Sequence, residues 1–305
     1  MPAKINIVCQ GVTPIHAAWT RPIFEKWFNI IPYDKTKTYS SRDIAFVLDS
    51  SEDWSEWSWP KFQDISYESP TVTTSYVSNG QLQLFFKDNW VIESAMWKYF
   101  GYNNYMASLG GDKFFLMLMH MVRPHRELLF RRTSHLHESS LVSYVARGIH
   151  LEGDMEYRLP TTSIWQRYCN MDWYNCTNFS VVAESYVTGL HFHSEKTFKP
   201  IAFGHPFVIY GTPGILNYLK SQGFATYDHI INESYDNIKE QSLRLSAITK
   251  ELNRLFEQFK EGSLFVDRET QQKAEHNHHT FFNDEKVEQI VYQQLALPLL
   301  EYINA

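Results

Sequence analysis

Phe179–Gly211, FSVVAESYVTGLHFHSEKTFKPIAFGHPFVIYG, is the stretch that decides the fold of this 305-residue chain. Its first five residues, FSVVA, predict a buried strand. A helix is expected from about Glu195 to Phe203, with Gly204 as its stop, and Pro206–Tyr210 predicts the next strand. Strand, loop, helix and strand at this spacing form a βαβ unit, which implies a parallel sheet and a right-handed crossover.

Candidate ligand-binding residues flank the expected helix. Glu184 and Ser185 come just past the carboxyl end of the first strand, where ligands of open α/β sheets bind. Ser194 suits the N-cap position, and a helix N-terminus attracts phosphate. Lys196 adds a cation that can reach a diphosphate, and Glu195 can accept hydrogen bonds from ribose hydroxyls. The alternative stays open that this Ser-Glu-Lys string is an ordinary helix start with a solvated ion pair.

The whole stretch resembles the donor-binding motif of the α-1,3-fucosyltransferase family. The matching residues are Ala183–Ser185, Ser194–Lys196, Gly204 and Pro206–Gly211. Here a serine replaces the family's threonine in Thr-Glu-Lys, and Ala-Glu-Ser replaces the usual Phe-Glu-Asn. The resemblance implies that Glu195 holds the donor ribose and Lys196 its phosphates. It also places Tyr210, in the closing strand, among the donor-binding residues.

Two neighbouring segments extend the resemblance. Gly211–Asp236, GTPGILNYLKSQGFATYDHIINESYD, resembles fucosyltransferase-like glycosyltransferases of large phages and marine bacteria. That group places an Arg-Pro-His-Arg turn after the first strand of its donor domain, and Arg123–Arg126 matches it. Arg123 and Arg126 are then expected to face the donor diphosphate, because arginine forks suit phosphate oxygens. The alternative is that one of them only forms a salt bridge.

The residue expected to act as the catalytic base is Glu68. It lies in a Glu-Ser-Pro string that resembles one in the acceptor half of fucosyltransferases, and a carboxylate there can accept the proton of an acceptor hydroxyl. Asp49, Glu52, Asp53 and Glu93 compete for the role. For each of these acids, a simple surface position is the plainer explanation.

The sequence predicts no metal site and no cofactor other than a nucleotide-sugar co-substrate. His191 and His193 form one histidine cluster, and His276, His278 and His279 form another, but neither has the spacing of a His-Glu-x-x-His site. The chain has no Asp-x-Asp string, which metal-dependent glycosyltransferases use to hold a cation. Lysine and arginine are expected to neutralise the leaving diphosphate instead.

Composition and charge narrow the partners. Aromatic residues make up 16% of the chain, which suits either a sugar-binding cleft or simply an aromatic core. The net charge of −6 disfavours a broad electrostatic grip on nucleic acid. Three cysteines without a CxxC pair fit a reducing compartment. The longest apolar run, Phe114–Val122, is too short to span a bilayer. We therefore expect a cytoplasmic protein without a membrane span.

The predicted fold is α/β and GT-B-like, with two Rossmann-like domains and a cleft between them. Residues 1–108 form the acceptor-side domain, residues 109–260 bind the nucleotide-sugar donor, and residues 261–305 are a C-terminal helical segment that packs across both. Further elements are expected as follows: strands at Ile5–Cys9, Ile44–Leu48 and Lys113–Met119, and helices at Asn89–Tyr99, Arg126–His137, Asp236–Phe259 and Lys286–Ile303.

The function expected from the resemblance is glycosyl transfer from a nucleotide sugar to a hydroxyl of a glycan or another acceptor, without a metal and with inversion. Three alternatives stay open: an enzyme that glycosylates a modified base in phage DNA, a non-catalytic glycan-binding module, and a structural protein that keeps a decayed transferase fold. The acidic net charge counts against the DNA acceptor. The sugar, the nucleotide and the acceptor are not specified by any motif.

Overall fold

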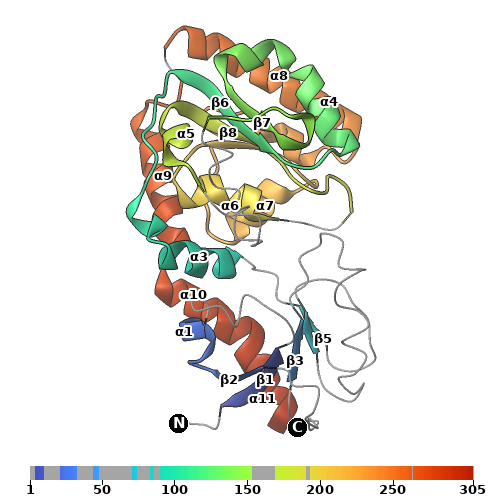
Figure 1. The fold of residues 1–305 in the computed structure, drawn as a ribbon, viewed down its shortest axis with the longest axis vertical. Helices are drawn as coiled ribbons and strands as arrows, with labels where there is room; N and C mark the ends of the chain where they lie inside the picture. Colours follow the sequence, from blue (N-terminus) through green and yellow to red (C-terminus); the bar gives the residue numbers. More distant parts are fainter. Residues whose placement is uncertain are drawn as a thin grey trace. The chain divides into compact units, whose positions relative to one another are not determined.

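The computed structural model describes residues 4–9, 21–32, 44–47, 71–73, 83–85, 90–152, 169–189, 193–262 and 264–304. The fold is α/β (Figure 1). The chain divides into two compact units: residues 1–102 with residues 282–305, and residues 103–281. The chain first passes from one unit to the other between residues 102 and 103, close to the boundary predicted at residue 108. The predicted C-terminal segment is divided between the two units.

The second unit contains a four-stranded parallel sheet in the order β7-β6-β8-β9. The strands are β6 (Lys113–Met119), β7 (Leu141–Tyr144), β8 (Thr177–Ala183) and β9 (Phe207–Tyr210). Every residue of β8 and β9 is buried, as expected for parallel strands covered on both faces. The strand predicted at Lys113–Met119 and the parallel pairing of β8 with β9 are confirmed.

Helices cover both faces of this sheet. Figure 1 shows α4 (Pro124–Arg132) and α8 (Gln241–Lys260) on one face, and α5 (Met171–Asn175), α6 (Glu195–Ala202) and α7 (Ile215–Ser221) on the other. Phe114 of β6 packs edge-on against Phe179 of β8 at 5.1 Å and against Phe256 of α8 at 5.0 Å between ring centroids. The aromatic side chains of the described second unit thus build much of its core.

Shorter elements and one long helix complete the second unit. They are the 3-10 helices η3 (Tyr102–Asn104), which begins at the boundary, η4 (Ser134–Ser139), η5 (Val145–Arg147) and η7 (Glu233–Asn237), together with α9 (Arg268–Phe281). The helix expected at residues 126–137 is wrong in its extent: α4 begins two residues earlier, at Pro124, because proline suits the first helical turn. Gly204 ends α6 with φ of 60°, and a Cβ there would lie 2.9 Å from the Ala274 carbonyl oxygen.

The first unit contains a five-stranded parallel sheet in the order β2-β1-β3-β4-β5. Its strands are β1 (Ile5–Cys9), β2 (Phe28–Pro32), β3 (Ile44–Val47), β4 (Thr71–Thr73) and β5 (Gln83–Phe85). Its helices are α1 (Arg21–Phe24), α3 (Trp90–Tyr99), α10 (Asp284–Val291), a π-helical segment (Tyr292–Ala296) and α11 (Leu297–Asn304). Within this unit, ion pairs join α10 to earlier parts of the chain: Asp284 pairs with Lys98 of α3, and Glu288 pairs with Lys26, which follows α1.

Both sheets place their strands in the same sequence, with the first strand between the second and the third. This order, 2-1-3-4 with a fifth strand in the first unit, is that of doubly wound α/β folds. In folds of this order, ligands bind beyond the carboxyl ends of the first and third strands, where successive crossovers leave toward opposite sides. In the second unit, this switch point lies between β6 and β8.

Acid should destabilise the second unit, because burial lowers the pKa of His205 from 6.5 to about 4, against the hydrogen bond to the Thr177 carbonyl. As the pH falls between these two values, His205 binds a proton in the unfolded chain but stays neutral in the folded chain. The free energy of unfolding should therefore fall over that window, by up to about 3 kcal/mol from His205 alone. Burial also lowers the pKa values of His125 and His137 to about 4, so they act in the same direction.

Urea denaturation between about pH 7 and about pH 4.5 measures this loss. His205→Gln should flatten the pH dependence, because it removes one of the groups that take up a proton on unfolding. A free energy of unfolding that stays level or rises on acidification would contradict the assignment.

Candidate functional site

The carboxylate of Glu184 is the hub of the site at the end of β8. Its side chain is fully buried and accepts four hydrogen bonds. The Ser194 N–H donates at 3.0 Å and the Ser194 hydroxyl at 2.7 Å, the Thr197 hydroxyl at 2.5 Å and the Ser185 N–H at 3.2 Å. A buried carboxylate is stable only with such donors, so Glu184 ties the end of β8 to the start of α6.

Ser194 is the N-cap of α6, as predicted. Its hydroxyl accepts a hydrogen bond from the Lys196 N–H at 3.3 Å, and its carbonyl accepts one from the Thr197 N–H at 3.1 Å. Protein groups therefore take most of the backbone donors that the sequence assigned to a phosphate. In this structure, side chains rather than the helix N–H groups supply the cationic character of the turn.

Glu195 and Lys196 form an ion pair with each other at 2.8 Å. Their side chains keep 18% and 15% of their surface exposed, unlike that of the fully buried Glu184. Burial alone would lower the pKa of Lys196, but the carboxylates of Glu195 and Glu184 outweigh burial, and the pKa is raised. Lys196 therefore carries a positive charge throughout the neutral pH range.

The turn after β6 reaches the same loop from the neighbouring strand. The buried guanidinium of Arg126 donates to the Ser185 hydroxyl at 3.4 Å and to the Met121 carbonyl at 3.2 Å. His125 Nε2 lies 2.8 Å from the Glu184 carbonyl oxygen and donates to it, since a carbonyl only accepts. Burial lowers the pKa of His125 to about 4, so the ring is neutral near pH 7. The two strand ends at the switch point are thus fixed to each other.

Arg123 lies at the outer edge of this arrangement. Its guanidinium stacks over the Tyr186 ring, with 5.2 Å to the centroid. Tyr186, Met121 and Val122 are exposed large side chains at the same carboxyl ends. This part of the site therefore offers a cation and apolar surface to solvent, whereas Arg126 is almost completely buried.

Each of the remaining predicted residues is either buried or outside the described residues. Tyr210 is fully buried at the end of β9, and burial raises the pKa of its phenol. Glu93 is buried in α3 of the first unit. Glu68 lies outside the described residues, as do Asp49, Glu52 and Asp53. The structure thus brings Arg126, Glu184, Ser185, Ser194, Glu195 and Lys196 together, with Arg123 at their edge, whereas the side chain of Tyr210 is buried. The catalytic base stays a prediction.

The described histidines of the two clusters contact backbone carbonyls or an aromatic ring. His276 contacts the Gly223 carbonyl at 2.8 Å, and His278 contacts the Ala202 and Asn103 carbonyls at 2.6 and 3.0 Å. His193 stacks on Tyr218 with centroids 4.1 Å apart, and His191 lies outside the described residues. Within the described ranges, no group of His, Cys, Asp and Glu side chains has the arrangement of a metal site.

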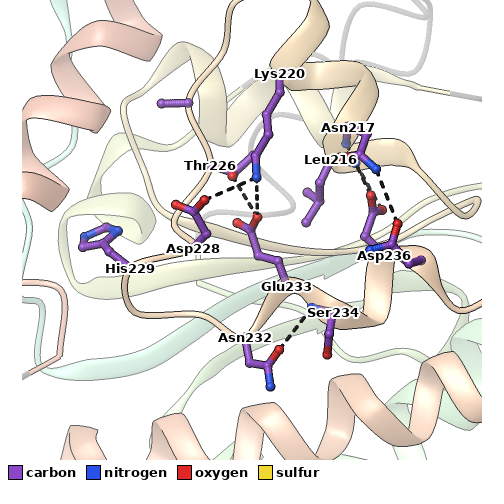
Figure 2. A network of polar contacts seen from close by, with 12 residues as sticks. Leu216, Asn217, Lys220, Thr226, Asp228, His229, Asn232, Glu233, Ser234 and Asp236 are labelled. Carbon is purple, nitrogen blue, oxygen red and sulfur yellow. Dashed lines mark hydrogen bonds and ion pairs between the residues drawn. The ribbon is translucent and has the colours of Figure 1, made fainter.

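The segment after β9 carries a second polar network, drawn in Figure 2. The buried carboxylate of Asp236 accepts hydrogen bonds from the Leu216 N–H at 3.2 Å and the Asn217 N–H at 3.3 Å, at the start of α7. Lys220 pairs with Glu233 at 3.1 Å and with Asp228 at 3.4 Å. Asp236 therefore places a protein carboxylate at the N-terminus of α7, where a helix favours negative charge.

Sequence reasoning missed three side chains of the site: His125, Thr197 and the buried Arg244 of α8. Thr197 follows directly after the Ser-Glu-Lys string. A second hydroxyl in the first helical turn could have indicated a buried acceptor nearby, which is the Glu184 carboxylate. His125 sat inside the quoted Arg-Pro-His-Arg turn. Nothing local in the sequence indicated that Arg244 reaches the site, because the contact that takes it there is with Val187, 57 residues earlier.

Comparison with known proteins adds no second line of support. No family model, curated protein or solved structure matches this chain. Among the described helices, none combines the length and apolar character needed to cross a bilayer. The site geometry therefore carries the functional argument.

Glu184→Ala should destabilise the protein by about 3 kcal/mol or more, because it strands several buried donors at once. Thr197→Val removes only one of those donors and should cost about 1–2 kcal/mol. Equilibrium urea unfolding of both variants measures the difference. Equal losses in the two variants would show that the Glu184 carboxylate does not act as the hub.

Proposed function

We propose that this chain is a metal-independent glycosyltransferase that takes its sugar from a nucleoside-diphosphate sugar, with the diphosphate bound beyond the carboxyl ends of β6 and β8. The observation that carries the proposal is the gathering of Lys196, Arg126 and Arg123 around one loop at the switch point of a doubly wound sheet. Anionic ligands of such sheets bind at this place.

The local charges favour a dianionic ligand. Three cations stand near two carboxylates, and the Glu184 carboxylate is fully engaged by protein donors. The Glu195 carboxylate is paired with Lys196 and lies at the surface. The site therefore has an excess of positive charge beside partly exposed side chains, which suits a diphosphate.

The chemistry asked of this site is stabilisation of a leaving group. An acceptor hydroxyl oxygen forms a bond to the anomeric carbon, and the bond from that carbon to the diphosphate oxygen breaks. The bonding electron pair leaves with the diphosphate, where the charge of Lys196 stabilises it. A carboxylate takes the proton of the hydroxyl, and Glu68 is our candidate for it. A single displacement of this kind inverts the anomeric configuration.

The GT-B-like arrangement belongs to the same proposal. Two units that each carry a parallel sheet of the same strand order support it. In such an arrangement, the first unit would hold the acceptor and the second the donor. Hydrolysis of a nucleotide sugar without acceptor would separate an enzyme from a non-catalytic glycan-binding module.

Lys196→Ala should lower kcat by roughly a hundredfold or more, because the ammonium meets charge that grows as the sugar leaves. A thermal-shift screen of nucleoside diphosphates and their sugars first selects the donor, since a ligand at 100 times its Kd stabilises by about 2.7 kcal/mol. Lys196→Arg should restore turnover only in part, because a planar fork replaces a compact ammonium. Near-normal turnover in Lys196→Ala, together with a much lower Tm, would assign the lysine a purely structural role.

Turnover should survive EDTA, because the proposal gives the work of a divalent cation to Lys196 and the arginines. Initial rates with and without the chelator measure this directly. Loss of activity that Mn²⁺ or Mg²⁺ restores would overturn the metal-independent mechanism while leaving the donor site in place.

A further inference from the structure

Arg244, in the first turns of α8, is a buried cation that the donor-site argument has not yet used. Its side chain is 1% exposed. It donates to the Ile238 carbonyl at 2.6 Å and the Lys239 carbonyl at 3.2 Å, and through Nη2 to the carbonyl of Val187. Its guanidinium carbon lies 5.9 Å from the centroid of the Tyr210 ring. Arg244 therefore joins α8, the end of β9 and the loop after β8.

Burying a guanidinium in this position costs desolvation free energy. Within the described parts of the chain, Arg244 forms no ion pair, and its hydrogen bonds go to backbone carbonyls alone. Burial lowers its pKa, although the side chain remains charged. An apolar side chain of similar length would avoid this desolvation cost. What the planar guanidinium provides at this position is three carbonyl contacts in a fixed geometry, rather than added stability of the fold.

The loop that Arg244 grips is the loop that forms the donor site. Val187 follows Ser185 by two residues, and Ser185 accepts a hydrogen bond from Arg126 at 3.4 Å. Glu184, one residue earlier, holds the start of α6 through its carboxylate. Arg126 holds this loop from the β6 side, and Arg244 holds it from α8. Loss of Arg244 would remove the contact of α8 with Val187, whereas Glu184 would keep its own hydrogen bonds to Ser194 and Thr197.

We propose that Arg244 is a positioning residue for the diphosphate site: it fixes the loop at Val187 so that the Arg126–Ser185 contact and Lys196 converge on one anion. The inference rests on the proposed function, because it assumes an anion at that site. It assigns Arg244 no contact with the ligand, and so predicts an effect on affinity that acts through the loop.

The experiment compares Arg244→Met and Arg244→Lys with Arg254→Met. Arg254 lies on the same helix, pairs with Glu251 at 2.6 Å and keeps 44% of its side chain exposed, so it controls for loss of one α8 arginine. The probe is inorganic pyrophosphate, with affinity measured by calorimetry at a temperature where each variant is folded. Hydrogen exchange of amides 185–187 reports the loop itself.

Arg244→Met should weaken pyrophosphate binding by about tenfold and speed exchange at residues 185–187, a size typical of residues that act on a site without touching its ligand. Arg244→Lys should recover part of the affinity, because it keeps the charge but cannot reach all three carbonyls. Arg254→Met should bind like the wild type. If Arg244→Met does not fold, Arg244→Lys decides by the same two readouts.

Two outcomes separate the proposals. Unchanged pyrophosphate affinity and unchanged exchange in the Arg244 variants, with weakened binding in Lys196→Ala, would overturn the role of Arg244 alone. Wild-type protein that binds neither pyrophosphate nor any nucleoside diphosphate would overturn the donor site itself. A lower Tm with unchanged affinity would make Arg244 an ordinary structural residue.

Discussion

The buried carboxylate of Glu184 is the constraint on which the second unit's site depends. A charge at zero exposure is tolerated only when donors surround it, and here these come from Ser185, Ser194 and Thr197. These hydrogen bonds hold the start of α6 beside the end of β8, and Lys196 lies in that first helical turn. The position of this partly exposed cation thus follows from the donors that the buried carboxylate needs.

The side chains of the site fall into two groups, those that are buried and hold elements together and those that reach the surface. Glu184, Ser185, Arg126 and Tyr210 are buried and hold elements together, whereas Glu195, Lys196 and Arg123 keep exposed surface. His125 and Arg126 extend the support from β8 to β6, and Arg244 extends it to α8. Rigid support of this kind is what a site needs in order to stabilise charge without reorganising at the moment of reaction.

The sequence predicted three of the four strands of the second unit, β6, β8 and β9, because their apolar runs are local signals, but it missed β7. The apolar run of β6 and the Ser194 cap of α6 are where the pattern placed them. It did not predict the roles of buried polar groups. Nothing in the spacing of Glu184 says whether its carboxylate points to a ligand or into the protein, since that depends on Thr197 and Ser194 in the folded chain.

Long-range partners explain the other gaps. Arg244 reaches the loop after β8 through Val187, a residue 57 positions earlier, and a local sequence pattern cannot predict such a pair. The strands β2, β4 and β5 of the first unit are short and carry weak periodicity, so they were missed while β1 was found. The candidate base Glu68 rests on a three-residue resemblance alone, and it lies outside the described residues.

The ion pair between Glu195 and Lys196 places two opposite charges 2.8 Å apart at the start of α6. Burial would lower the pKa of Lys196, but the carboxylates of Glu195 and Glu184 raise it, so the lysine keeps its proton. Glu184 thus has two effects on this turn: its hydrogen bonds hold the start of α6 in place, and its negative charge helps to keep Lys196 charged.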